Sequence, residues 1–211
     1  YGASVARVQR DFKYVIGYSS VSHMGFVLLG LMTLSLIGLD GAVLQMFSHG
    51  VIAGLLFAVA GRMVYDRTHT RDLGELGPMR LAHVIPFAAV TFVLAGMASI
   101  GLPGFSGFIA EFQVLVGAWH SLPWLVPVAG VGIVVGIAFT WRALTKVFYG
   151  EAAPGTPAPS LPPITLPEKL GTLLLLASTL FVGLYPRILI DLIQPGLQSP
   201  LVEGLRRGGL R

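Results

Sequence analysis

Apolar residues run along this chain in long stretches separated by short polar segments, and they do not alternate residue by residue. Stretches of about 20 apolar residues are long enough to cross the hydrocarbon core of a bilayer as helices. Four stretches predict membrane-spanning helices, over residues 13–37, 41–65, 125–148 and 170–184. A β-barrel would alternate apolar and polar positions over short segments. The pattern therefore favours an all-α, polytopic membrane protein that forms one membrane domain over residues 1–211.

A fifth apolar stretch, residues 81–119, is too long for one simple helix and contains a break. Helical backbone does not pass cleanly through closely spaced glycine and proline, and such residues crowd together at Gly101, Pro103, Gly104 and Gly107. We predict one discontinuous crossing, made by residues 81–100 and 107–119, and about five crossings in total. A six-crossing alternative, in which residues 108–119 cross alone, gives a similar charge bias, and span length favours five.

Glu111 follows this break and has apolar residues on both sides. Non-helical backbone at membrane depth is tolerated against protein or water, so the break supplies polar groups and room for water. An ionisable residue within a membrane segment is by default a hypothesis about an ion or proton path. Burial favours the neutral form of the carboxyl group, which suits a group that loads and releases a proton. The alternatives are a structural ion pair or an acid that reaches the membrane surface.

Two histidines on consecutive predicted spans extend this polar interior. His23 follows a serine-rich half-span, and His49 lies one helical turn after Gln45. Histidine titrates near neutral pH, so both are candidates for proton transfer with Glu111. Each alone could equally be a hydrogen-bonded core residue, and haem ligation by the pair is a further alternative. The supporting polar axis consists of Gln45, Ser19, Ser20, Ser22 and Lys13, although Lys13 sits at a helix start, where snorkelling to the surface also explains it.

Composition and charge narrow the class of protein. The chain is 54% hydrophobic and 11% charged, against about 25% charged residues in soluble domains. Cysteine is absent, so thiolate-ligated iron–sulfur clusters and disulfides are excluded for this chain. Lysine and arginine cluster at helix ends, which explains the net charge of +4 without nucleic acid. With five crossings ten of the 14 basic residues fall on one side, which the positive-inside rule makes cytoplasmic and which leaves the C-terminus periplasmic.

The segments between the apolar stretches are predicted to be exposed to water. Residues 38–40 turn the chain, and residues 66–80 form a charged interfacial loop. Residues 151–167 are rich in proline and predict a solvated cytoplasmic linker that packs against no core. Residues 188–211 form a polar C-terminal tail with weak amphipathic character. The start lacks an initiator methionine, so we expect the chain to begin in the middle of a larger protein, with residues 5–12 as the wet end of an incomplete helix.

Four motifs resemble one known family. They are DFKYVIGYSSVSHMGF at residues 11–26, QMFSHG at 45–50, YDRTHTRD at 65–72 and GLPGFSGFIAEF at 101–112. Together they are similar to the antiporter-like proton-pumping subunits of respiratory complex I (NADH:quinone oxidoreductase), and among these to chain M, which is NADH dehydrogenase subunit 4 in mitochondria. Related subunits, including those of Mrp-type cation/proton antiporters, usually carry lysine at the position of Glu111. Ala110 stands where the family pattern has glycine.

The resemblance implies a fourteen-helix protein with two inverted five-helix repeats, of which residues 13–187 would be the last five helices. Glu111 would be the terminal protonatable group on a broken helix, with His49 and His23 on a hydrated axis. It implies a non-redox subunit of a proton-pumping translocase in the bacterial inner membrane, with other membrane-arm subunits and lipid as partners. Flavin, iron–sulfur clusters, quinone and metal would lie on other subunits. Alternatives are an Mrp-type antiporter subunit, a hydrogenase-linked ion pump, or a dihaem electron-transfer subunit.

Overall fold

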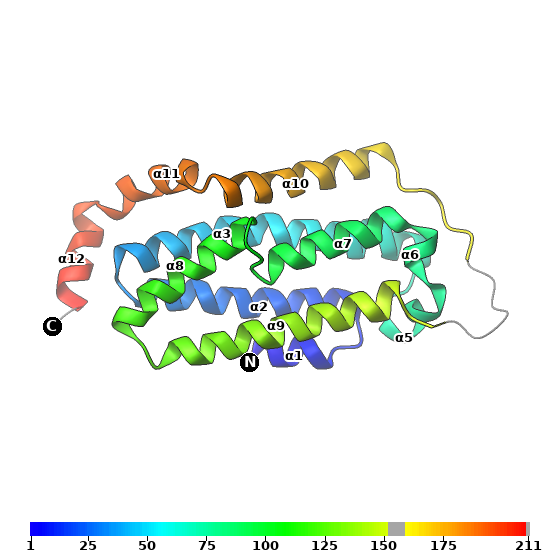
Figure 1. Ribbon diagram of the computed structural model, residues 1–211, viewed down its shortest axis with the longest axis horizontal. Helices are drawn as coiled ribbons and strands as arrows, with labels where there is room; N and C mark the ends of the chain where they lie inside the picture. The colour runs from blue at the N-terminus through cyan, green and yellow to red at the C-terminus, as the bar shows by residue number, and fades with distance from the viewer. Residues whose placement is uncertain (152–158, 210–211) are drawn as a thin grey trace.

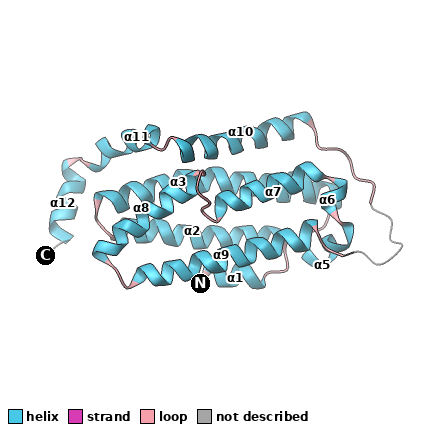
Figure 2. Ribbon diagram, viewed as in Figure 1, coloured by secondary structure: helices cyan, strands magenta, loops and turns pink. Residues whose placement is uncertain are grey.

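The computed structural model describes residues 1–151 and 159–209, and its elements are helices throughout these ranges (Figures 1 and 2). The long helices are α2 (Phe12–Met32), α3 (Leu36–Phe57), α9 (Leu125–Phe148) and α10 (Leu166–Leu184). They lie roughly side by side along the long axis of the molecule. The prediction of an all-α fold is confirmed for the described part of the chain.

Among the described residues, four helices are long and apolar enough to cross a membrane, and each overlaps one predicted span. One of them, Leu36–Thr68, is longer than predicted. It continues from α3 through a π-helical segment, η1 (Ala58–Tyr65), into α4 (Asp66–Thr68). The predicted loop over residues 66–80 thus begins with α4 and contains two further short helical pieces, α5 (Leu73–Leu76) and η2 (Gly77–Met79).

The predicted discontinuous crossing is present as two shorter helices. Helix α7 (Pro86–Ser99) follows α6 (Leu81–Val84), and the break separates α7 from α8 (Ser106–Ser121). At 1.5 Å per residue, the 14 residues of α7 and the 16 of α8 extend about 21 and 24 Å, less than the ~30 Å hydrocarbon core. Figure 1 shows them nearly end to end along the molecule, with the loop at its middle. The total of five crossings stays a prediction.

The turn between α2 and α3 lies earlier in the chain than predicted. We expected residues 38–40 to turn, but the turn occupies residues 33–35, and Asp40 is a buried residue inside α3. The reason is a helix cap: the Ser35 hydroxyl accepts a hydrogen bond from the backbone N–H of Gly38 (3.0 Å). Such a cap satisfies a backbone donor at the helix start and fixes where the helix begins.

The ends of the chain are also more ordered than the sequence indicated. Residues 2–8 form α1 (Gly2–Val8), which packs on α2 and α9 and buries Ala3 and Ala6. Arg7, Val8 and Arg10 are exposed, as expected for a wet helix end. The tail contains two helices, α11 (Arg187–Leu197) and α12 (Pro200–Gly209). Helix α11 packs against α3 at the same end of the molecule as the α2–α3 turn (Figure 1).

The proline-rich linker is anchored at its C-terminal side. Residues 152–158 lie outside the described ranges. Ile164 is buried and belongs to the main hydrophobic core, and Leu161 packs against it. The expectation that residues 151–167 pack against no core is therefore wrong for this part, and the linker ends at Thr165, which caps α10 together with Glu168.

Gly183 of α10 holds the helix break in place. A Cβ on Gly183 would lie 2.3 Å from the backbone oxygen of Gly104 and 2.4 Å from the carbonyl carbon of Phe105. Backbone atoms cannot move aside as a flexible side chain can, so we expect Gly183→Ala to push the α7–α8 loop away and to destabilise the protein by about 1–3 kcal/mol. Gly171→Ala on the same helix has no atom within 4 Å and is the control. Equal thermal stability of the two variants in detergent would show that this packing is not needed.

Candidate proton-transfer site

Glu111 lies in the second turn of α8, close to the helix break, and is 6% exposed. Its Oε1 atom lies 3.2 Å from Nδ1 of His23 on α2. The same oxygen accepts a hydrogen bond from Nε2 of Gln45 on α3 (3.4 Å). Three helices thus bring one carboxylate, one imidazole and one amide together, and the direct histidine partner of Glu111 is His23.

His23 is held from both sides. Its Nε2 atom lies 3.1 Å from the hydroxyl oxygen of Ser99, the last residue of α7, while Nδ1 faces Glu111. An imidazole with a partner on each nitrogen can accept a proton at one nitrogen and release it at the other. Sequence reasoning missed Ser99, which precedes the break in an apolar stretch; a hydroxyl residue within two positions of Gly101 was the available signal.

His49 lies next to this pair without touching Glu111. Its ring centroid is 5.1 Å from that of His23, with 33° between the ring planes. A cavity of about 10 Å³ is lined by His23, Gln45, His49 and Glu111 together with residues of α3, α7 and α8. Gln45 Oε1 is buried and has no hydrogen-bond partner. The prediction that His49 belongs to the polar interior is consistent with this placement, and its direct partner is His23.

A second cavity, of about 20 Å³, also adjoins His23 and Glu111. Ser22, His23, Ser99 and Glu111 line it together with residues of α9. A polar cavity needs about 10–15 Å³ to hold one water molecule. His23 and Glu111 line both cavities, so space of about the size of one water molecule adjoins their contact.

The glycine at the start of the break is required by geometry. Gly101 has φ +71°, a left-handed conformation that side chains disfavour. A Cβ there would also lie 2.8 Å from Oε2 of Glu111. Gly104 likewise has φ +104°, and a Cβ on Gly107 would lie 2.6 Å from the backbone oxygen of Ala98. Pro103 is exposed in the loop between them.

The remaining predicted residues fall into two groups. Ser22 reaches the site as a cavity wall, whereas the hydroxyls of Ser19 and Ser20 donate to the backbone oxygen of Ile16 in their own helix. Lys13 lies with its Nζ 4.7 Å from the ring centroid of Tyr65, a cation–π contact near the charged loop. The contacts of Ser19, Ser20 and Lys13 are thus with groups other than Glu111 and His23.

A second polar chain was not foreseen. Ser48 of α3 lies 2.7 Å from Ser106 at the start of α8, and Ser106 lies 3.1 Å from Thr179 of α10. All three are buried and joined through hydroxyl oxygens. Single hydroxyls in apolar stretches give no sequence signal of this kind, because the pairing depends on how the helices pack.

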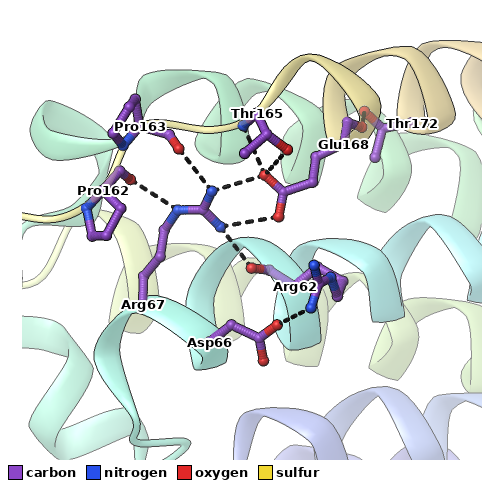
Figure 3. Close-up of polar contacts among 8 residues, drawn as sticks. All are labelled: Arg62, Asp66, Arg67, Pro162, Pro163, Thr165, Glu168 and Thr172. Carbon is purple, nitrogen blue, oxygen red and sulfur yellow. Dashed lines mark hydrogen bonds and ion pairs between the residues drawn. The ribbon is translucent and has the colours of Figure 1, made fainter.

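The charged loop also contains a buried ion pair, contrary to the expectation of a solvated loop. The guanidinium of Arg67 donates to both carboxylate oxygens of Glu168 (2.8 and 3.3 Å) and to the backbone oxygens of Arg62, Pro162 and Pro163 (Figure 3). The two charged side chains are 6% and 11% exposed. This contact ties α4 to the start of α10 across 101 residues of sequence.

The fold is that of a polytopic helical membrane protein with a discontinuous helix. Residues 1–138 match the family described as NADH:quinone oxidoreductase/Mrp antiporter, transmembrane. The chain belongs to this family, and the prediction of a polytopic membrane protein of the complex I antiporter type is confirmed.

Individual relatives agree with the family assignment. The chain is 38% identical over 197 residues to NADH-quinone oxidoreductase subunit M of Rhodobacter capsulatus, covering 93% of this chain and 38% of that one. It is 34% identical to subunit M of Escherichia coli over 192 residues, 90% of this chain and 37% of that one. The chain thus spans less than two fifths of the length of these relatives.

Solved structures share the fold. A chain of respiratory complex I from Thermus thermophilus superposes with a TM-score of 0.80 at 32% identity, covering 98% of this chain and 42% of that one. A chain of the Mrp complex from Dietzia superposes with a TM-score of 0.79 at 24% identity, covering 90% and 43%. The second likeness concerns the fold alone.

Proposed function

We propose that the complete protein is a proton-translocating membrane-arm subunit of NADH:quinone oxidoreductase, without redox chemistry of its own. The observation that carries this proposal is the buried contact between Glu111 and His23 at a break in a membrane helix. Two titratable groups at hydrogen-bond distance can pass a proton between them. Neither needs a cofactor to do so.

The local chemistry follows from burial and charge. With the proton on Glu111, both groups are neutral, and with the proton on His23 they form an ion pair. A cation that arrives nearby along the axis favours the ionised carboxylate, which then accepts the hydrogen bond from Gln45. Alternating these two conditions loads and releases one proton at Glu111 while the helices stay in place. His23, between Glu111 and Ser99, relays the proton through its two nitrogens.

Topology, partners and cofactors are proposed on the same basis. The charged loops face the cytoplasm and the C-terminus faces the periplasm of a bacterial inner membrane, because most basic residues lie on the loop side. The partners are the other membrane-arm subunits, including neighbouring antiporter-like ones, and lipid. Flavin, iron–sulfur clusters and quinone belong to other subunits.

Two alternative functions are disfavoured by particular observations. An Mrp-type antiporter subunit, or a hydrogenase-linked ion pump of that type, would usually carry lysine in place of Glu111. A dihaem subunit would need an open porphyrin site at His23 and His49. Both nitrogens of His23 already face Glu111 and Ser99, and the adjoining cavities of about 20 and 10 Å³ hold at most a water molecule.

Purification of the tagged full-length protein from its own membranes tests the assignment. We expect it to co-purify with flavin- and iron–sulfur-containing subunits and with NADH:quinone activity. A complex that contains Mrp-type subunits and lacks flavin would contradict the proposal. A haem absorbance that is lost in His49→Ala would contradict it in favour of electron transfer.

A further inference from the structure

A second buried carboxyl group lies outside the site described above. Asp40 is in the second turn of α3 and is 6% exposed. Its Oδ2 atom accepts a hydrogen bond from Nε2 of Gln194 on α11 (3.3 Å). Its Oδ1 atom is buried and has no hydrogen-bond partner. Asp40 therefore has one satisfied oxygen and one free oxygen in the interior of the protein.

A permanently ionised carboxylate is a costly occupant of this position. Burial of a charge is tolerated when a counter-charge and hydrogen bonds compensate it. Among the described residues Asp40 takes part in no ion pair, and its hydrogen-bond partner is a neutral amide. A proton on Oδ1 removes the charge, and a water molecule there satisfies the free oxygen. Either condition makes Asp40 a group that can exchange a proton.

Asp40 lies along α3 between Gln45 and the α2–α3 turn at one end of the molecule. It precedes Gln45, the hydrogen-bond partner of Glu111, by five residues, about 7.5 Å along α3 toward the α2–α3 turn. Helix α8 runs to the same end, since the Ser121 hydroxyl near its terminus donates to the backbone oxygen of Thr33 in that turn. Helix α5 of the charged loop lies at the opposite end (Figure 1).

Helix α11 covers Asp40 and connects it to the surface. Leu189 and Ile193 of α11 pack against a buried cluster that contains Leu44, which lies one helical turn after Asp40. Gln194, which holds Asp40, is half-buried, and its neighbours Pro195 and Gly196 are exposed. Helix α11 thus shields the Asp40 carboxyl group from lipid, and the Gln194 side chain lies between Asp40 and the surface.

A further unpaired acceptor lies across the α3–α8 contact. The Oε1 atom of Gln113 is buried and has no partner. Gly41, next to Asp40, packs so closely on α8 that a Cβ there would lie 2.9 Å from the Cβ of Gln113. Gln113 follows Glu111 by two residues on α8. Gln113 is therefore a second polar side chain at the α3–α8 contact whose acceptor a water molecule would satisfy.

We propose that Asp40 is a proton-transfer residue between Glu111 and the surface at the α2–α3 turn, with Gln194 as its positioning residue. This inference rests on the proposed function. The O–H bond of the Glu111 carboxyl group breaks, the proton moves through water, and an O–H bond forms at Oδ1 of Asp40. That bond breaks in turn as the proton passes to water beside Gln194, and Asp40 returns to a carboxylate. No electron is transferred in either step.

The test is Asp40→Asn in the complete complex, reconstituted in vesicles, with proton pumping and NADH:quinone turnover measured together. Asparagine keeps the size and the acceptor for Gln194 but cannot carry a proton, so we expect pumping about tenfold slower. Asp40→Glu should restore most of it. Asp191→Asn, an exposed carboxylate on α11, is the matched control and should pump as the wild type does.

Three outcomes separate this inference from the function on which it rests. Wild-type pumping in Asp40→Asn with slow pumping in Glu111→Gln would overturn the role of Asp40 and leave the proposed function standing. Wild-type pumping in both variants would overturn both. If Asp40→Asn fails to assemble, Gln194→Leu is the fallback, because it removes the positioning amide and keeps the carboxyl group. Wild-type pumping in Gln194→Leu would overturn the inference. Slow pumping in Asp40→Glu, which means no rescue, would also overturn it.

Discussion

Glu111→Gln in the complete protein is expected to slow proton pumping by about tenfold or more, because a positioned proton-transfer group typically contributes ~10²–10⁴-fold. Glutamine keeps the shape of the side chain and can still hydrogen-bond His23 and Gln45. Glutamine cannot ionise, so His23 has no carboxylate at 3.2 Å with which to exchange a proton. Turnover coupled to pumping should fall with it, while the complex assembles at wild-type levels. Proton uptake by vesicles containing the reconstituted complex measures the effect.

Two controls separate ionisation from packing at this position. Glu111→Asp keeps a carboxyl group on a shorter side chain and should retain part of the activity. Glu75→Gln removes an exposed carboxylate in the charged loop and should pump as the wild type does. A wild-type ratio of protons to electrons in Glu111→Gln would mean that this carboxyl group is structural.

Arg67→Ala is expected to lower the free energy of unfolding by about 3–5 kcal/mol, because it leaves a buried carboxylate without its counter-charge. Arg67 donates to Glu168 and to three backbone oxygens, so the substitution also leaves several acceptors unsatisfied (Figure 3). The start of α10 and residues 162–165 should then detach from α4. The change is measured by thermal denaturation of the purified complex, with loss of this subunit from the complex as the signal.

The neighbouring arginine supplies the control for this prediction. Arg62 pairs with Asp66 four residues later, and the two side chains are 71% and 41% exposed. An exposed ion pair contributes about 0–1 kcal/mol, so Arg62→Ala should change stability little. Adding Glu168→Gln to Arg67→Ala should recover part of the loss, because the unpaired charge is then gone. Equal stability of Arg67→Ala and Arg62→Ala would show that the buried pair is not a clamp.

The helices and the centre of the site could be predicted because their signals are local. Apolar stretches of membrane length defined the spans, and Gly101 to Gly107 marked the break between α7 and α8. A carboxyl group and a histidine within apolar stretches are costly unless they meet polar partners, so Glu111 and His23 stand out from their neighbours in the amino-acid sequence alone.

The features that could not be predicted depend on packing between distant segments. The pairing of Arg67 with Glu168 spans 101 residues, and neither residue differs in sequence context from an ordinary surface charge. Asp40 was placed in a turn because Gly38 and Gly41 flank it, whereas the Ser35 cap starts the helix earlier. Ser99 contacts His23 across 76 residues of sequence, so the pairing depends on how α7 packs near α2.

The central claim is that Glu111 changes its protonation state during turnover, and infrared difference spectra of the reduced and oxidised complex test it most directly. The wild type should show a carboxylic acid carbonyl band that is absent in Glu111→Gln and present in the Glu75→Gln control. Identical carboxyl bands in the wild type and Glu111→Gln would mean that Glu111 keeps one protonation state throughout and would contradict the account.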